Sequence, residues 1–153
     1  MNILFEYYFC SDRLAMKITG DKKHGDRLKH MTGSGLDAEL ARGLFVAGKE
    51  IEIEAEHSIT EGSVSGKGHV PSAAGSPPNA DTRLLDTSID TFVVSQSPPT
   101  VHVVSSAPYS AALEWGTSKM EARPFMQPAT DKKRKMGIEI IARIINRRNR
   151  KSV

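Results

Sequence analysis

Residues 36–60 read LDAELARGLFVAGKEIEIEAEHSIT, and this stretch decides the fold. Its apolar residues recur every three or four positions, which is the spacing of one face of an α-helix. The members of this stripe are Leu36, Leu40, Leu44, Ala47, Ile51, Ala55 and Ile59. Ser34 lies just before the pattern and is a suitable N-cap residue. The stretch therefore predicts an amphipathic helix of about seven turns with one apolar stripe.

Four glutamates occupy every second position in the second half of this helix. They are Glu50, Glu52, Glu54 and Glu56. A spacing of two distributes side chains around a helix instead of placing them together on one face. They are therefore not expected to form a catalytic pair of carboxylates, and we predict that they lie on a solvated face.

Two runs rich in β-branched residues follow later in the chain, at 90–96 and 100–106, with Ser97-Pro-Pro99 between them. They predict an antiparallel hairpin with a short turn. Because side chains alternate along a strand, Val93 and Val94 should face opposite sides of the sheet, as should Val103 and Val104.

Short helices are predicted on both sides of the hairpin, at 82–89 and 108–116. A last helix is predicted from Pro128 to about residue 147, since proline suits a first helical turn. Its apolar stripe would be Met136, Ile140 and Ile144, with Ile141 and Ile145 alongside. Together these elements predict an α+β fold. A long amphipathic helix and flanking short helices would pack on a small antiparallel sheet, with a long extended loop.

The loop is the segment 61–81, which is rich in Gly, Ser and Pro. Its start, GSVSGKGH (62–69), resembles a phosphate-binding loop only superficially. A phosphate-binding loop has four residues between its first glycine and its Gly-Lys pair, whereas only three separate Gly62 from Gly66-Lys67. Gly68 then stands where that loop has a Ser or Thr that binds magnesium. We therefore predict a contact arm that orders on partners, with Lys67, His69 and Pro71 as candidate contact residues.

Length and composition limit the class of protein. A chain of 153 residues suggests one domain. The sequence contains no run of eighteen apolar residues, so no membrane span is expected. The first ten residues lack a basic lead and a cleavage site, so no secretory signal is expected. The single cysteine, Cys10, allows neither an internal disulfide nor a cysteine cluster for a metal.

Charge is distributed unevenly along the chain. Residues 131–153 carry nine Lys or Arg and two acidic residues, a net charge of +7, whereas the whole chain carries +3. A basic tail on a slightly acidic body suggests an anionic partner, although a simple solvated terminus is an equally good interpretation. The candidate contacts to DNA or to an acidic protein are Arg143, Arg147, Arg150 and Lys151.

No catalytic arrangement is recognisable. The five histidines, at 24, 30, 57, 69 and 102, do not show a zinc-binding spacing. The segment GSVSG (62–66) has the glycine spacing of a nucleophile elbow, but Val64 stands at its centre. We therefore expect no enzyme activity, no cofactor and no metal site.

The segment SSAPYSAALEWGTSKMEARPFMQPA (105–129) closely resembles a signature of the gene-product-ten family of HK97-like tailed bacteriophages. The matching positions are Tyr109, Glu114, Trp115, Gly116, Thr117, Pro124, Phe125, Pro128 and Ala129. A second segment, GHVPSAAGSPPNADTRLLDTSI (68–89), resembles another signature of that family. The resemblance spans about residues 16–145. It implies a domain at 16–147, with residues 1–15 as an N-terminal extension and 148–153 as a basic C-terminal tail.

The resemblance implies a non-enzymatic component of the virion at the head–tail junction, assembled in the host cytoplasm. Proteins of this family are described as neck, tail-completion or minor tail proteins. The implied partners are further copies of the chain, in a six- or twelve-fold ring, and other neck and tail proteins. DNA in the channel is a further candidate, and no membrane is implied.

Within the signature, the candidates for contact between subunits are Tyr109, Glu114, Trp115, Gly116, Thr117, Arg123 and Phe125. Aromatic residues are common anchors of protein interfaces. The competing interpretation for Tyr109, Trp115 and Phe125 is packing in the core of the subunit itself.

A nucleic-acid-binding module that uses the basic C-terminal helix is the alternative function. A basic helix face can bind phosphates, with an affinity that falls steeply as salt increases. The strands at 90–106 lack the interleaved aromatic residues on which bases would stack. The two functions are compatible, because DNA passes through a phage neck.

Overall fold

The structure is a computed structural model that describes residues 6–10, 13–17, 22, 25–26, 28–29, 34–64 and 66–151. Its elements are, in order, β1 (Glu6–Cys10), β2 (Arg13–Lys17), α2 (Ser34–Thr60), η1 (Gly66–Gly68), η2 (Asp86–Ser88), β3 (Ile89–Gln96), β4 (Pro99–Ser105), α3 (Ser110–Trp115) and α4 (Met126–Lys151). The helices pack on a small two-stranded antiparallel sheet, which confirms the predicted α+β class.

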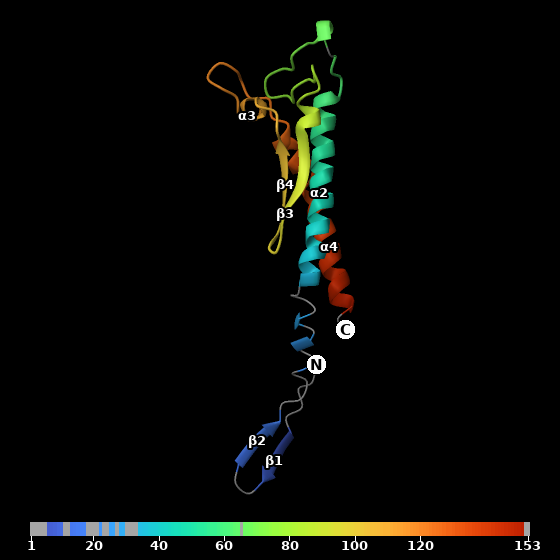
Figure 1. Ribbon diagram of the computed structural model, residues 1–153, viewed down its shortest axis with the longest axis vertical. Helices are drawn as coiled ribbons and strands as arrows, with labels where there is room; N and C mark the ends of the chain where they lie inside the picture. The colour runs from blue at the N-terminus through green and yellow to red at the C-terminus, as the bar shows by residue number, and fades with distance from the viewer. Residues whose placement is uncertain are drawn as a thin grey trace.

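Helix α2 is the centre of the fold, with α4 along one side and the β3–β4 hairpin along another (Figure 1). A Cβ atom added at Gly43 would meet Ile144 and Ile141 of α4. One added at Gly48 would meet Thr91 and neighbouring side chains of the hairpin. The absence of side chains at these two positions therefore lets both partners approach the helix closely. The predicted helix is confirmed, but it buries two sides and not one stripe.

The β3–β4 hairpin matches the prediction closely. The strands pair antiparallel with Thr91 opposite Val103, and a two-residue turn joins them. The register shifts between Val93 and Ser95, so that Val94 is an extra residue in β3. Val93 and Val94 are both exposed, at 42% and 51%. The bulge interrupts the regular alternation at this point, so exposure alone does not assign the two residues to opposite faces, and that prediction stays a prediction.

The shorter elements differ from the prediction in extent. Only a single 3-10 turn, η2, forms in the region 82–89 where a helix was predicted. Helix α3 is confirmed within 108–116. Helix α4 begins two residues before Pro128 and continues to Lys151. Proline is tolerated there because the first turn of a helix has no carbonyl to which its missing N–H could donate.

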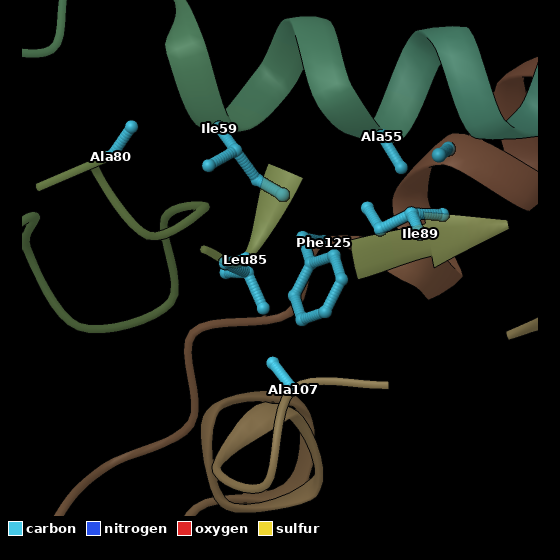
Figure 2. Close-up of a cluster of buried hydrophobic side chains, with 8 residues drawn as sticks. Ala55, Ile59, Ala80, Leu85, Ile89, Ala107 and Phe125 are labelled. Carbon is cyan, nitrogen blue, oxygen red and sulfur yellow. The ribbon is translucent and has the colours of Figure 1, made fainter. Parts of the chain in front are cut away.

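The buried core lies where α2 ends, next to the start of α4 (Figure 2). Phe125 and Ile59 are its largest fully buried side chains. The ring of Phe125 lies among Leu85, Ile89 and Ala107. Phe125 was offered as an interface candidate, but at 1% exposure it has no surface left for a partner. For this residue core packing is the correct interpretation.

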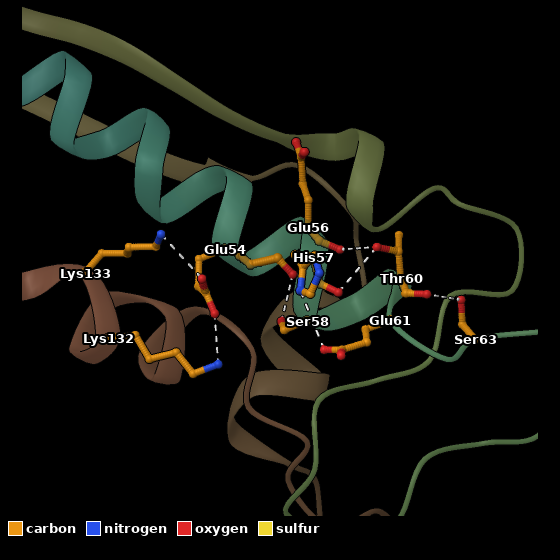
Figure 3. Close-up of polar contacts among 10 residues, drawn as sticks. Glu54, Glu56, His57, Ser58, Thr60, Glu61, Ser63, Lys132 and Lys133 are labelled. Atoms are coloured by element: carbon orange, nitrogen blue, oxygen red, sulfur yellow. Dashed lines mark hydrogen bonds and ion pairs between the residues drawn. The ribbon is translucent and has the colours of Figure 1, made fainter.

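Three of the four glutamates predicted on a solvated face of α2 form ion pairs: Glu50, Glu52 and Glu54. Glu54 points from α2 toward α4, where Lys132 Nζ and Lys133 Nζ lie 2.8 Å and 3.5 Å from its carboxylate oxygens (Figure 3). The hydrogen bond from Lys132 holds the pKa of the Glu54 carboxyl below its usual value. Glu50 is also paired with Lys133. These contacts join the two long helices.

Glu52 contradicts the prediction of a solvated face most directly, since it is only 8% exposed. Burial raises the pKa of its carboxyl, but Lys49 and neighbouring groups outweigh burial, so the pKa lies below its usual value. Lys49 Nζ lies 2.8 Å from Glu52 Oε1. The prediction failed because Glu52 is on the side of α2 that faces the hairpin.

The segment 61–81 has little regular structure, as predicted, but it folds back on the domain instead of extending from it. The Ala80 N–H donates to Ile59 O at 3.0 Å, and the Gly75 N–H donates to Ala122 O at 2.9 Å. Within the segment, Asn79 Nδ2 donates to Val70 O at 2.8 Å. These bonds tie both the middle and the end of the loop to other elements.

Strands β1 and β2 form a hairpin of their own, in which Tyr8 lies opposite Ala15. The predicted boundary between an extension and the domain, at residues 15 and 16, falls inside β2. In the segment 17–31, the spacing of Leu28 and Met31 predicts a short helix, and most of this segment lies outside the described residues. Among the helices that are described, none is long and apolar enough to cross a membrane.

Candidate interaction surface

The candidate site lies at the end of the molecule where α2 stops. The loop 61–81, α3 and the loop after α3 gather at this end (Figure 1). This end carries a carboxylate that holds α4, a turn that presents a tryptophan, and a pocket beside them.

Glu114, on α3, binds the first turn of α4. Its Oε2 accepts hydrogen bonds from the backbone N–H groups of Phe125 and Met126 at 2.9 Å and 3.1 Å. Its Oε1 accepts one from Gln127 at 2.9 Å. The first N–H groups of a helix have no partner within the helix, and negative charge is favourable at that end. Glu114 therefore acts as the cap of α4 from a different helix.

The turn after α3 depends on Gly116. Its φ of 73° and ψ of 179° form a backbone conformation that is essentially restricted to glycine. A Cβ atom there would lie 2.9 Å from both Ala122 N and Met120 O. Thr117 and Met120 then form a backbone bridge that closes the loop. The turn leaves Trp115 at the surface, with 76% of the residue exposed.

A pocket of about 340 Å³ lies beside α3. Its wall comes from the end of the long loop, from the turn before η2, and from α3. The residues that line it include Pro71, Leu84, Asp86, Tyr109, Leu113 and Arg123. Trp115 is not among the lining residues. It lies two positions after Leu113, which places the two side chains on roughly opposite faces of the helix.

Polar groups of the pocket wall are incompletely bonded. Asp86 Oδ2 pairs with Arg83 Nη2 at 3.0 Å, but Asp86 Oδ1 is buried and has no hydrogen-bond partner among the described residues. The same holds for Ser72 Oγ and Arg123 Nε. Arg83 has a φ of 60°, which is uncommon for a residue with a side chain. Buried groups without partners and backbone strain often mark binding sites.

The structure brings several predicted contact residues together around this pocket. His69, Pro71, Tyr109 and Arg123 all line it. Lys67 and Thr117 are exposed nearby in the chain, on η1 and on the turn after α3. Glu114 and Gly116 shape the corner formed by α3, the turn after it and the start of α4. They do not present side chains to a partner.

Sequence reasoning missed Leu84 and Asp86. The stretch that contains them was interpreted as a short helix, whereas it forms an irregular turn before η2. Leu84 is 49% exposed at the pocket, a property that appears only in the folded chain.

The basic residues of the tail are partly paired within the chain. Arg147 Nη2 lies 3.6 Å from a carboxylate oxygen of Glu39 on α2. Arg143 Nη2 lies 3.8 Å from Glu139 on α4 itself. Arg150 is exposed, and the side chain of Lys151 lies outside the described residues. The four candidates therefore do not form one uniformly available basic face.

In the part of the chain that the structure describes, no group of three His, Cys, Asp or Glu residues could hold a metal ion. The chemistry of the site is that of an aromatic side chain at the surface and a half-polar pocket beside it.

Comparison of the chain with protein-family models, with curated proteins and with solved structures found no match.

Proposed function

We propose that the protein is a non-enzymatic structural subunit of a tailed-phage particle or prophage, located at the head–tail junction, where it assembles into a ring. The observation that carries the proposal is the exposure of Trp115, at 76%. Tryptophan is among the residue types most often found as energetic anchors of protein interfaces. A neighbouring subunit would bury this surface.

The residues that resemble the phage signature support this proposal through their roles. Glu114 caps α4, Gly116 forms the turn, and Phe125 anchors the core. Together, these three residues hold the corner between α3 and α4 against the core. Among the large apolar side chains of the described segment 105–129, Trp115 and Tyr109 are the exposed ones.

The long helices offer further apolar surface for a partner. Val46 and Ile53 of α2 are 51% and 55% exposed, and Ile138 and Ile145 of α4 are 63% and 42% exposed. Each pair is seven residues apart, the spacing that keeps side chains on one side of a helix. Such surface fits contacts with other neck or tail proteins.

Light scattering on the purified chain, alone and with neck and tail proteins of the same particle, tests the proposal. We expect a closed oligomer, six- or twelve-fold by the resemblance, because one repeated head-to-tail contact closes into a ring. The same chain should be found in purified virions. A strict monomer under all these conditions that never enters particles would refute the function.

DNA binding by the end of α4 is the second candidate function. Arg143 and Arg150 are exposed there, and the helix is strongly basic. The ion pair between Arg147 and Glu39 reduces the charge available for phosphates. We therefore favour a contact between this helix and an acidic protein.

A filter-binding titration at low salt distinguishes the two candidates. The informative variant replaces Arg143, Arg147, Arg150 and Lys151 by Gln. DNA binding should be weak in the wild-type chain and little changed in the variant, whereas joining of particles should be impaired. Tight, salt-sensitive DNA binding that the variant loses would support the nucleic-acid function instead.

A further inference from the structure

We infer that Trp115 of one copy inserts into the pocket beside α3 of the next copy, so that one repeated contact builds the assembly. The inference rests on the proposed function, since it specifies how the subunits meet. The occupant of the pocket is therefore a second copy of this chain, and the pocket is its docking site.

The size of the pocket fits an aromatic side chain. A cavity of about 150 Å³ in a protein core can hold benzene. The present pocket measures about 340 Å³, which leaves room for the larger indole ring. Leu84, Leu113 and Pro71 line it and give the ring an apolar contact surface.

The polar groups of the pocket also complement an indole. The indole N–H is a donor only, and when buried it usually finds an acceptor. Asp86 Oδ1 is an acceptor without a donor among the described residues. Arg83 and Arg123 line the same pocket, and an arginine guanidinium interacts favourably with the face of an aromatic ring.

Access to Asp86 requires a small movement. The Asp86 side chain is only 4% exposed, whereas that of Arg83, which pairs with it, is 66% exposed. We expect the exposed Arg83 side chain to shift when the ring enters, which would rearrange its two contacts with Asp86 Oδ2. The movement would bring the guanidinium onto the indole and the indole N–H toward Oδ1.

The positions of tryptophan and pocket favour assembly over a closed pair. Leu113 of α3 and Tyr109, at its N-cap, line the pocket, whereas Trp115 lies on roughly the opposite face of α3 from Leu113. The contact uses two different surfaces of the subunit, and where two copies do not make it reciprocally it is heterologous. A repeated heterologous contact generates a ring when its rotation closes.

Two half-interface variants test the inference. Trp115→Ala removes the inserted side chain and keeps the pocket, whereas Leu84→Arg fills the pocket and keeps the tryptophan. Each should be monomeric alone, with self-association weakened at least about 30-fold, which corresponds to about 2 kcal/mol. An equimolar mixture should form a one-to-one dimer, because it contains a single intact contact.

Controls separate folding from assembly. Thr82→Arg is a second pocket-filling variant, because Thr82 is exposed and lines the pocket. Val70→Arg changes an exposed apolar residue outside the lining and should assemble as the wild type does. Circular dichroism should show the same helix content in all variants.

Fluorescence provides an independent readout, since Trp115 is the single tryptophan of the chain. Its emission should shift to shorter wavelength as the wild-type protein is concentrated, and Val70→Arg should show the same shift. Leu84→Arg should keep the emission of an exposed tryptophan at all concentrations.

The outcomes distinguish the inference from the function on which it rests. If the wild type assembles but Trp115→Ala assembles equally well, or the emission does not shift, the contact is wrong and the function stands. If each half-interface variant is monomeric but their mixture forms no dimer, the pocket is the wrong acceptor. A wild-type chain that never assembles overturns both.

Discussion

Glu114 Oε2 lies 2.9 Å from the backbone nitrogen of Phe125, so a side chain of α3 holds the start of α4 beside the largest residue of the core. The same carboxylate also accepts from Met126 and Gln127. One residue therefore connects the surface corner to the packing of the domain, and its loss should affect both.

Glu114→Ala should lower the free energy of unfolding by about 1–3 kcal/mol, because three backbone donors lose a charged acceptor. For a chain of this size the melting temperature should fall by about 2–4 °C per kcal/mol. Calorimetry of the variant measures the change. Glu121→Ala, at an exposed position of the neighbouring loop, is the control and should melt with the wild type. Equal melting of Glu114→Ala would contradict the capping role.

Gly116→Ala should destabilise the fold by more than the strain of its backbone alone. That strain is worth about 1–3 kcal/mol, and the new Cβ would also crowd Met120 O and Ala122 N at 2.9 Å. Gly62→Ala is the matched control, since its φ is 69° but nothing lies within 4 Å of the new atom. Urea denaturation should rank Gly116→Ala well below Gly62→Ala. The reverse order would refute the close approach.

Glu54 and Glu56 are two residues apart, and their contributions to the stability of the fold should change in opposite directions as the pH falls. Lys132 lowers the pKa of Glu54 in the folded state, so its contribution is present above the unfolded pKa and disappears as pH falls through the folded value. Burial, then repulsion from Glu52 and Asp86, raises the pKa of Glu56, so its ionised form opposes folding near neutral pH.

Stability measured between about pH 3 and pH 7 tests this pair. Glu54→Gln should be less stable than the wild type at pH 7, and the difference should shrink in acid. Glu56→Gln should be more stable at pH 7, and its advantage should also shrink in acid. If both variants were more stable than the wild type at pH 7, or both less stable, one of the two environments would be wrongly described.

A chain that starts at Met16 should keep its melting temperature within a few degrees, equivalent to under about 1 kcal/mol. The truncation removes β1 and most of β2, whereas every residue of the buried core cluster lies between 55 and 129. Deleting residues 141–151 is the comparison, because it removes Ile141 and Ile144 from the surface that meets α2. Only this second deletion should unfold the domain at moderate temperature.

The sequence predicted the elements whose signals are local. The periodic residues of α2 and the β-branched runs of the hairpin each reveal their structure within a short window. The loop was recognised from its composition, but its return to the domain depends on single bonds such as Ala80 N–H to Ile59 O. No window of sequence contains such a contact.

The candidate site was predicted in part for the same reason. Tyr109, Trp115 and Arg123 were identified through a resemblance, and the structure places all three on or beside one corner. The capping role of Glu114 joins residues eleven to thirteen positions apart, across two helices. The burial of Glu52 depends on which side of α2 faces the hairpin, which periodicity alone does not determine.

Helix α2 has one further consequence, through its length. Its 27 residues extend about 40 Å, and close packing against α4 and the hairpin along its sides makes it a stiff strut. The angle of a contact at the Trp115 end therefore determines where the opposite end of the subunit lies. A difference of about 5° in how neighbouring copies tilt would move their far ends by about 3–4 Å over that length. In a ring of such subunits, the angle set at one rim would determine the diameter of the other.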